Sequence, residues 1–422
     1  MPIASLLLIA FSIVLLALSA STLYVATYAW WDPKRRDRTG YPADPGSTGL
    51  SFSLIMPCRK EPETVMRATL DGLRAQTHPD FEIIVSVGHD DPETVAVAER
   101  LAAEHPDRVR VSIDRSEAKN KPRQLNTALA DCTKDVVGVF DAESIAAPAL
   151  LANIDASFRA TGADAVQGAV QLVNYRDSWF ALRNCLEYFV WFRSRLHAHA
   201  QLGFIPLGGN TVFVRRHLLD AIGGWDEGCL AEDCELGVRL STEGHKIVVA
   251  YSPELVTREE APDSVAALVR QRTRWSLGFM QVYAKGVWRR LATVRERLTA
   301  RWTLTQQHFM ALTGIAIPVS IGLAIWGDFP LPVTLIAFLP LITTLGTVAI
   351  EACMLREFGR DHGFAISTRD YVRLVLSTPV YQALLAVAAV RAYVKFRLGD
   401  FRWEKTDHSG SHLGYLGAEA AR

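Results

Sequence analysis

The sequence predicts an α/β domain with a mainly parallel sheet, held between apolar segments near both ends of the chain. Apolar residues make up 49% of the 422 residues and charged residues 21%. The two kinds are segregated, because the charges gather in the middle of the chain and the apolar runs lie toward its ends. In the middle, strand-like runs alternate with helical patterns, a rhythm typical of a parallel sheet covered by helices.

The first element we expect is a membrane anchor over residues 1–31. Residues 3–31 are almost wholly apolar and long enough to cross about 30 Å of hydrocarbon. Trp30-Trp31 and a basic cluster follow at the boundary, which favours a cytoplasmic flank and an N-terminus outside. A cleaved signal peptide is the alternative, with Ala17-Leu18-Ser19 as its cleavage site, but no basic residue precedes the apolar run.

A linker over residues 32–49 is followed by a domain expected over residues 50–262. The expected strands are 52–56, 81–87, 109–113 and 136–140, and the expected helices are 64–74, 92–104 and 123–130. Ligands of such sheets bind outside the carboxyl ends of the strands. Asp90 and Asp91 follow the second strand and Asp141 ends the fourth, so these carboxylates are expected to face one crevice.

Residues 263–300 carry apolar side chains among basic ones. This pattern predicts amphipathic helices lying at the membrane surface, and a buried core helix is the alternative. Equal numbers of basic and acidic residues, 45 of each, give no reason to expect a nucleic-acid partner. The six cysteines form no Cys-x-x-Cys pair and have no histidine at zinc-finger spacing, so we expect reduced, buried thiols in a cytosolic domain.

Residues 301–396 contain two apolar spans, near 307–326 and 331–353, and a shorter stretch at 374–390. Four full crossings from an outside N-terminus would end outside, whereas the basic residues that follow favour the cytoplasm. Either the last stretch is re-entrant or interfacial, which we favour, or the charges are a poor guide here. Residues 397–422 are then a cytoplasmic tail.

Asp141-Ala142-Glu143 places two carboxylates two residues apart at a strand end. Hard cations such as Mg²⁺ or Mn²⁺ prefer carboxylate oxygens from one or two residues together with phosphate oxygens. The pattern alone is weak, because surface turns often produce it. Together with the other clusters it predicts that Asp141 and Glu143 bind a metal.

A second acidic pair, Glu232-Asp233, precedes a helical pattern that begins near Leu236. Carboxylates are favoured at a helix N-terminus, so a pair that only caps the helix is the simpler interpretation. Upstream, the loop residues Gly209 and Asn210 precede an apolar run at 211–214, which could bring a second substrate to this pair.

Gln271, Arg274 and Trp275 are three or four residues apart, so they share one face of a helix. Arginine can clamp a diphosphate, and tryptophan offers a flat platform for a sugar ring. For Arg270 and Arg272, a basic face that meets anionic lipid remains the alternative.

In this order the clusters resemble the family 2 glycosyltransferases of the cellulose synthase and hyaluronan synthase type. Those enzymes carry a D, D-x-D, E/T-D, Q-x-x-R-W signature on a GT-A fold flanked by membrane helices. The resemblance covers residues from about 50 to 290. It implies a GT-A-type (Rossmann-like) glycosyltransferase domain inserted between the N-terminal and C-terminal transmembrane helices.

The resemblance also implies roles for single residues. The residues implied to bind the donor are Pro57, Glu61, either Asp90 or Asp91, Lys121, Asp141 and Arg274. Catalysis falls to Asp233 with Glu232 beside it, and acceptor binding to Gly209, Asn210, Gln271 and Trp275. Trp403, Lys405 and Thr406 resemble a gating loop that closes over the bound donor.

The implied activity is an inverting, Mg²⁺- or Mn²⁺-dependent transfer of a hexose or N-acetylhexosamine from a UDP-sugar to a growing polysaccharide. The protein is expected in the plasma membrane as a multi-pass chain with its catalytic domain cytoplasmic, in contact with lipid and with a possible export partner. One alternative is a single transfer to a lipid acceptor, giving a glycolipid. Another is a non-catalytic secretion scaffold, against which the intact carboxylate set argues.

Overall fold

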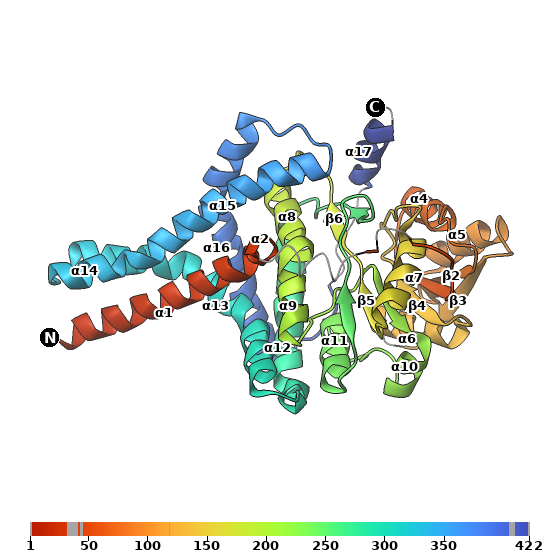
Figure 1. Ribbon diagram of the computed structural model, residues 1–422, viewed down its shortest axis with the longest axis horizontal. Helices are drawn as coiled ribbons and strands as arrows, with labels where there is room; N and C mark the ends of the chain where they lie inside the picture. The colour runs from red at the N-terminus through yellow and green to blue at the C-terminus, as the bar shows by residue number, and fades with distance from the viewer. Residues whose placement is uncertain (1, 32–40, 43–44, 118, 405–409, 421–422) are drawn as a thin grey trace.

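The computed structural model describes residues 2–31, 41–42, 45–117, 119–404 and 410–420 (Figure 1). A seven-stranded sheet forms the centre of the domain, in the order β3-β2-β1-β4-β7-β5-β8. β7 runs antiparallel to both of its neighbours, and the other pairs are parallel, so the expected mainly parallel sheet is confirmed. The strands are β1 Phe52–Cys58, β2 Phe81–Gly88, β3 Val109–Asp114, β4 Val136–Val139, β5 Ala165–Gln167, β7 Val212–Arg215 and β8 Ile247–Val249. A separate pair joins β6 Val170–Leu172 to β9 Thr257–Glu259.

The helices of this domain are α4 Glu63–Arg74, α5 Pro92–Ala103, α6 Lys121–Asp131, α7 Leu150–Thr161, α10 Arg216–Ile222 and α11 Glu232–Thr242. Two of them begin at a side-chain cap followed by proline in the first turn. Asp91 caps α5 by accepting from the Thr94 amide, and Asn120 caps α6 by accepting from the Arg123 amide at 3.0 Å. Such caps satisfy amides that have no partner inside the helix, which fixes where these helices begin.

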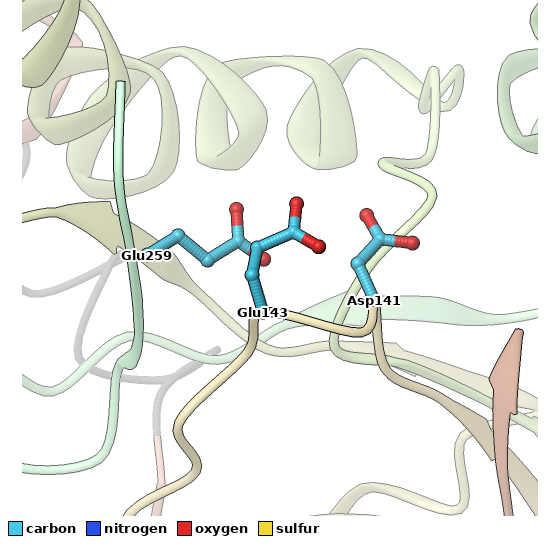
Figure 2. Close-up of side chains that lie close together, drawn as sticks. All are labelled: Asp141, Glu143 and Glu259. Atoms are coloured by element: carbon cyan, nitrogen blue, oxygen red, sulfur yellow. The ribbon is translucent and has the colours of Figure 1, made fainter. Parts of the chain in front are cut away.

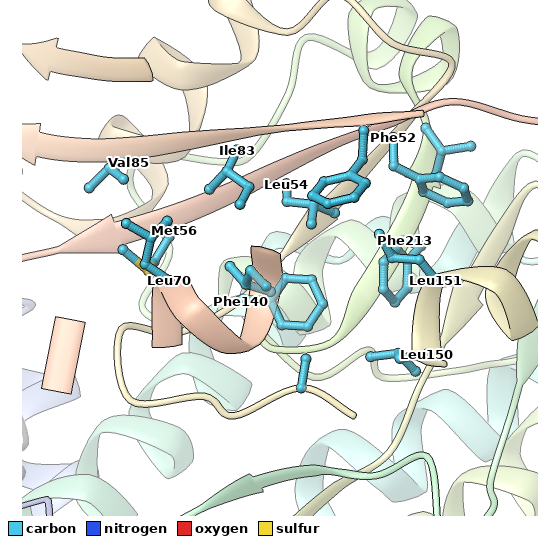
Figure 3. Close-up of a cluster of buried hydrophobic side chains, with 14 of the residues drawn as sticks. Phe52, Leu54, Met56, Leu70, Ile83, Val85, Phe140, Leu150, Leu151 and Phe213 are labelled. Carbon is cyan, nitrogen blue, oxygen red and sulfur yellow. The ribbon is translucent and has the colours of Figure 1, made fainter. Parts of the chain in front are cut away.

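The main core lies between the sheet and the helices on one of its faces (Figure 3). Phe213 of β7 meets Phe52 and Phe140 edge to face, with ring centroids 6.1 Å and 5.7 Å apart. On β4, a Cβ atom at Gly138 would lie 2.7 Å from the Phe213 ring. The glycine therefore lets this ring lie flat over the strand that ends at the site.

Within the described residues, three helical segments are long and apolar enough to cross a membrane: α1 Ile3–Ala26, the pair α14 Leu331–Ala337 with α15 Leu339–Asp361, and α16 Thr368–Leu398. A fourth, α13 Val294–Trp326, is bent by 61° between Phe309 and Ala311. α1 packs against α13 and α15 through small polar side chains. Ser12 lies 3.3 Å from Ser320 and Ser19 lies 2.6 Å from Thr343, Oγ to Oγ or Oγ1. Small residues let membrane helices approach closely, so α1 is an integral part of this bundle.

A second group of helices runs across the first in Figure 1. It contains α8 Trp179–Val190, a π-helical turn Trp191–Arg195, α9 Leu196–Leu202, α12 Val265–Lys285 and α16. α16 exposes an apolar stripe from Val372 to Val394, at helical spacing. The remaining elements are the short α2 Tyr28–Trp31, a 3₁₀ turn Val287–Arg290 and α17 Ser411–Ala420.

Three observations bear on the expected organisation of this region. The expected boundary at residue 300 lies inside α13. α13 is the bent helix, and the 374–390 stretch lies in the continuous helix α16, so it is not re-entrant, while its interfacial placement stays a prediction. α12 packs against α11, α13 and α16, as the core-helix alternative predicts, and its contact with a membrane surface stays a prediction. Of the six cysteines, all free, Cys353 on α15 is exposed and the other five are buried.

The packing predicts that Phe213→Ala is strongly destabilising. The side chain is fully buried, so its removal leaves a cavity and should cost about 3–5 kcal/mol. The measurement is the midpoint of thermal unfolding of the full-length protein in detergent. Phe401→Ala is the matched control, because that ring is 40% exposed, and an equal loss in both variants would contradict the proposed core.

Candidate active site

Three carboxylates converge beyond the end of β4, in the order Asp141, Glu143, Glu259 across Figure 2. Each offers an oxygen within 4.8 Å of the oxygens offered by the other two. Glu259, at the end of β9, was missed in the sequence, because nothing in its neighbourhood marks it as a ligand. An antiparallel bridge between Ile145 and Arg258 brings it beside Glu143, with both amide-to-carbonyl distances at 3.0 Å.

The three carboxylates are fixed by hydrogen bonds, and their negative charges crowd one another. Burial and the neighbouring Asp141 raise the pKa of Glu143 to about 7, and burial, Glu143 and Asp141 raise the pKa of Glu259 well above its usual range. Ser144 Oγ donates to Glu259 at 2.6 Å, and the Asn210 amide donates to the same oxygen. Asn210 thus orients a carboxylate, which is a different contact from the expected acceptor contact. Crowded, fixed carboxylates fit a hard divalent cation.

Lys121, the first residue of α6, is the cation beside this cluster. Its ammonium pairs with Asp141 and donates to the carbonyl of Gly209 at 2.9 Å. Burial opposes the charged form, but Asp141, Glu232 and Asp233 outweigh it and raise the pKa of Lys121. The lysine therefore stays protonated, as its expected place near a diphosphate requires.

Glu232 and Asp233 lie in the first turn of α11, as the sequence predicted. Burial and Asp233 raise the pKa of Glu232 to about 7, and burial raises that of Asp233. Asp233 Oδ1 accepts from the Cys234 amide at 2.7 Å. Opposite, a Cβ atom at Gly209 would lie 3.1 Å from Asp233 Oδ2 and 3.2 Å from Lys121 Nζ. Glycine at this position lets the loop run between these two charges without displacing either of them.

α12 brings Gln271, Arg274 and Trp275 to the same cavity. Gln271 is buried, and its Oε1 accepts no hydrogen bond within the described part of the chain. The Arg274 guanidinium lies 5.7 Å from the centre of the Trp403 ring. Lys405 and Thr406 lie outside the described residues, so the rest of the expected gating loop stays a prediction.

Arg272 has a different role from its neighbours. It pairs with Glu187 and donates to Asn184 Oδ1 at 2.7 Å, which ties α12 to α8. The guanidinium also lies 4.6 Å from the centre of the Trp275 ring. The alternative that Arg272 meets anionic lipid at the membrane surface is therefore wrong, because Glu187 neutralises its charge inside the protein.

The remaining predicted donor residues do not line this cavity. Asp91 is committed to the backbone, because Oδ2 accepts from the Lys60 amide at 2.7 Å and from Thr94 Oγ1 at 2.6 Å. Asp90 is more accessible and pairs with Arg59 at 2.8 Å, which lowers the pKa of its carboxyl. Pro57 lies in β1 and Glu61 follows that strand. Of the two aspartates, Asp90 is the one whose side chain can reach a ligand.

The cavity has a volume of about 530 Å³. It extends from the carboxylates to the apolar helices α1, α13, α15 and α16, called the membrane-type helices below. At one end it is lined by Lys121, Asp141, Glu143, Gly209, Asn210, Glu232, Asp233, Glu259, Gln271, Arg274, Trp275 and Trp403. At the other end it is lined by Thr22 and Ala26 of α1, Gln306 and Gly314 of α13, Thr347 of α15 and Gln382 of α16. One continuous space therefore connects the charged site with the helix bundle.

Comparisons with known proteins agree with this geometry. A family model described as "Glycosyltransferase like family 2" matches residues 49–278. A β-monoglucosyldiacylglycerol synthase of Trichormus variabilis is 27% identical over 376 residues, which cover 86% of this chain and 77% of that protein. A poly-β-1,6-N-acetyl-D-glucosamine synthase of Staphylococcus epidermidis is 21% identical over 284 residues, which cover 64% of this chain and 63% of that protein.

Among solved structures, a mannosyltransferase of Pyrobaculum calidifontis superposes with a TM-score of 0.62 at 19% identity. The match covers 93% of this chain and 99% of that chain. Its similarity extends beyond the sheet to the apolar helices on either side. The fold is therefore the GT-A-type α/β fold that the sequence predicted.

The contact between α11 and α12 yields a prediction for Gly278. A Cβ atom there would lie 2.5 Å from Ala231 Cβ and 2.7 Å from the Ala231 amide nitrogen, so Gly278→Ala must push α12 away. We expect a net loss of about 1–3 kcal/mol from this overpacking, seen as a lower midpoint of thermal unfolding.

Gly346→Ala is the matched control, because it is also inside a helix and its nearest neighbour is Leu23 Cδ2 at 4.0 Å. This change should stabilise by about 0.5–1 kcal/mol through helix propensity. A Gly278→Ala variant as stable as the Gly346→Ala variant would show that the two helices do not touch here.

Proposed function

Because the chain belongs to family 2 of the glycosyltransferases, we propose that it transfers one hexose or N-acetylhexosamine from a UDP-sugar to a lipid acceptor. The observation that carries the proposal is the cavity, which joins the carboxylate site to the space between the membrane-type helices. An acceptor embedded in lipid can reach Asp233 through this space. The similarity to the β-monoglucosyldiacylglycerol synthase, over 86% of the chain, favours this product over the polysaccharide that we first expected.

The donor half of the site suits a nucleoside diphosphate. Asp141, Glu143 and Glu259 would hold Mg²⁺ or Mn²⁺, and such an ion supplies charge neutralisation for a departing diphosphate. The similar mannosyltransferase was solved with GDP-mannose and Mn²⁺, which supports a metal at this position. Lys121 and Arg274 add two fixed cations, whose role is to hold the phosphate oxygens and to stabilise the charge that develops there.

Asp233 is the proposed general base. Its carboxylate takes the proton of the acceptor hydroxyl while the oxygen attacks the anomeric carbon and the bond to UDP breaks on the opposite side. The configuration at that carbon is therefore inverted. Burial raises the pKa of Asp233, which makes the carboxylate a stronger base than one in water. Gly209 keeps the space in front of it open.

The helices suggest how this site meets the plasma membrane. α1, the second half of α13 and α15 run side by side and lead away from the domain, while α16 runs across them (Figure 1). If α1, α13 and α15 cross the membrane and α16 does not, a chain with its N-terminus outside ends in the cytoplasm. The basic residues at the C-terminal end of α16 favour the same side. The exposed apolar stripe of α16 then lies in the membrane interface, and the catalytic domain is cytoplasmic.

Asp233→Asn tests the function directly. We expect a 10²- to 10⁴-fold lower kcat for UDP release, with the affinity for UDP little changed, because only the base is lost. The measurement uses full-length protein in lipid with Mn²⁺, a panel of UDP-sugars and crude membrane lipid, and the product is sized.

Arg301→Gln, an exposed change outside the cavity, is the control and should turn over normally. A product of one sugar on lipid supports the proposal, and a polymer replaces it with the polysaccharide function. Loss of UDP binding in Asp233→Asn would place this residue on the donor side instead.

Metal binding should depend on Glu259 and on pH. Because a ligand must be deprotonated and the pKa of Glu143 is raised to about 7, Mn²⁺ affinity should fall as the pH is lowered from 8 to 6. Glu259→Gln should weaken Mn²⁺ binding by at least about tenfold, measured by calorimetry on the purified protein.

The matched control is Glu260→Gln. That carboxylate accepts from the Gly410 amide and Ser411 Oγ, each at 2.9 Å, and so is engaged with the C-terminal segment. An equal loss of affinity in both variants would contradict the assignment of Glu259 as a ligand.

A further inference from the structure

The membrane side of the cavity contains an arginine that forms no ion pair with any residue that the structure describes. Arg195 stands where the π-helical turn meets α9, and it lines the cavity. Among the residues that the structure describes, no carboxylate pairs with it and no group accepts a hydrogen bond from its Nε, which is buried. A π-helical turn inside a helix often marks a functional position, because the wider turn re-aims the side chains.

The surrounding charges do not neutralise it. Arg183 pairs with Glu351 at 2.8 Å, and Arg272 pairs with Glu187. Both carboxylates lie close enough to act on Arg195, but each already has an arginine partner. Three guanidinium groups therefore share two carboxylates at this end of the cavity.

Nearby polar groups add no negative charge. His199 follows Arg195 by one helical turn, and burial together with the charge of Arg195 lowers the pKa of the imidazole to about 4, so the ring is neutral. Thr22, Gln306 and Gln382 are neutral as well. Arg195 is partly buried and its Nε is fully buried, and a guanidinium removed from water in this way is costly without a partner, so this end of the cavity is suited to an anion.

The position of Arg195 indicates which kind of anion it binds. The cavity wall here includes Ala26 of α1 and Met354 of α15, two helices long and apolar enough to cross a membrane. Both residues lie near the ends of their helices toward the domain, where lipid head groups meet a bilayer protein. We propose that Arg195 binds the phosphate group of a membrane lipid. A guanidinium can donate two parallel hydrogen bonds to a phosphate, an arrangement that the neutral neighbours cannot replace.

This site is separate from the metal carboxylates, and it extends the proposed function by naming a charged group that the cavity recognises. The proposed phosphate site rests on the proposed function in one respect, since both require that a lipid enters the cavity. Its test measures binding without any donor sugar, so a protein that fails to transfer sugar to lipid can still pass it.

The experiment compares dioleoyl phosphatidic acid with dioleoylglycerol, which differ only by the phosphate. Full-length protein in nanodiscs of neutral lipid is titrated with each, and the retained radiolabelled lipid is measured. We expect wild type to prefer the phosphate-bearing lipid by at least about tenfold, as one charge-assisted contact allows. Arg195→Gln should lose the preference, and Arg195→Lys should keep part of it.

Arg301→Gln removes an exposed arginine and should leave the preference unchanged, which separates this site from general attraction to an anionic surface. Equal preference in Arg195→Gln and wild type would overturn the proposal. The proposal would also be overturned if inorganic phosphate at millimolar concentration displaced phosphatidic acid and bound as tightly as that lipid. The natural ligand would then be free phosphate in solution. A normal thermal unfolding midpoint for Arg195→Gln confirms that the variant is folded.

Discussion

Five carboxylates gathered around one lysine form the constraint on which the site depends. They are Asp141, Glu143, Glu232, Asp233 and Glu259, and Lys121 is the ammonium among them. Like charges in a buried space cannot all be ionised, so burial and mutual repulsion raise the pKa values of Glu143 and Glu232 to about 7. A divalent cation and a substrate hydroxyl are the two partners that can use this arrangement, one as a counter-charge and the other as a proton source.

The sequence predicted the elements in which hydrophobic pattern and capping residues agree. β1 and β2 are largely apolar runs, so the edge of the sheet that carries Asp141 could be inferred, whereas α6 begins at Lys121, two residues before the expected start at residue 123. The position of Glu259 could not be inferred, because its approach to Glu143 depends on a bridge between residues 113 positions apart in the chain. β5, β6, β8 and β9 have three residues each, too few to show a period.

The charged residues of α12 show a similar limit. The basic residues of α12 look solvent-facing in sequence, but Arg272 meets Glu187 from α8, and only the tertiary structure shows that pair. The helix with the exposed apolar stripe is instead α16, whose basic C-terminal end is tied down by Glu404, which accepts from Arg391 and Lys395. Trp403 precedes Glu404 in the chain and lies beside Arg274, so the segment after α16 forms part of the cavity wall.

The two ends of the cavity carry opposite charge, and this polarity gives each substrate its own route. The acidic end lies past the strand ends of the sheet, on the side proposed for the cation and the nucleotide. The end near Arg195 lies between helices suited to lipid and carries the surplus positive charge. A lipid bound by its polar group at that end must point toward Asp233 to reach the donor. Gly209 lets its loop lie close to Asp233, and Gly278 lets α12 pack directly on Ala231, so the loop and α12 both lie against the start of α11, where the proposed base stands.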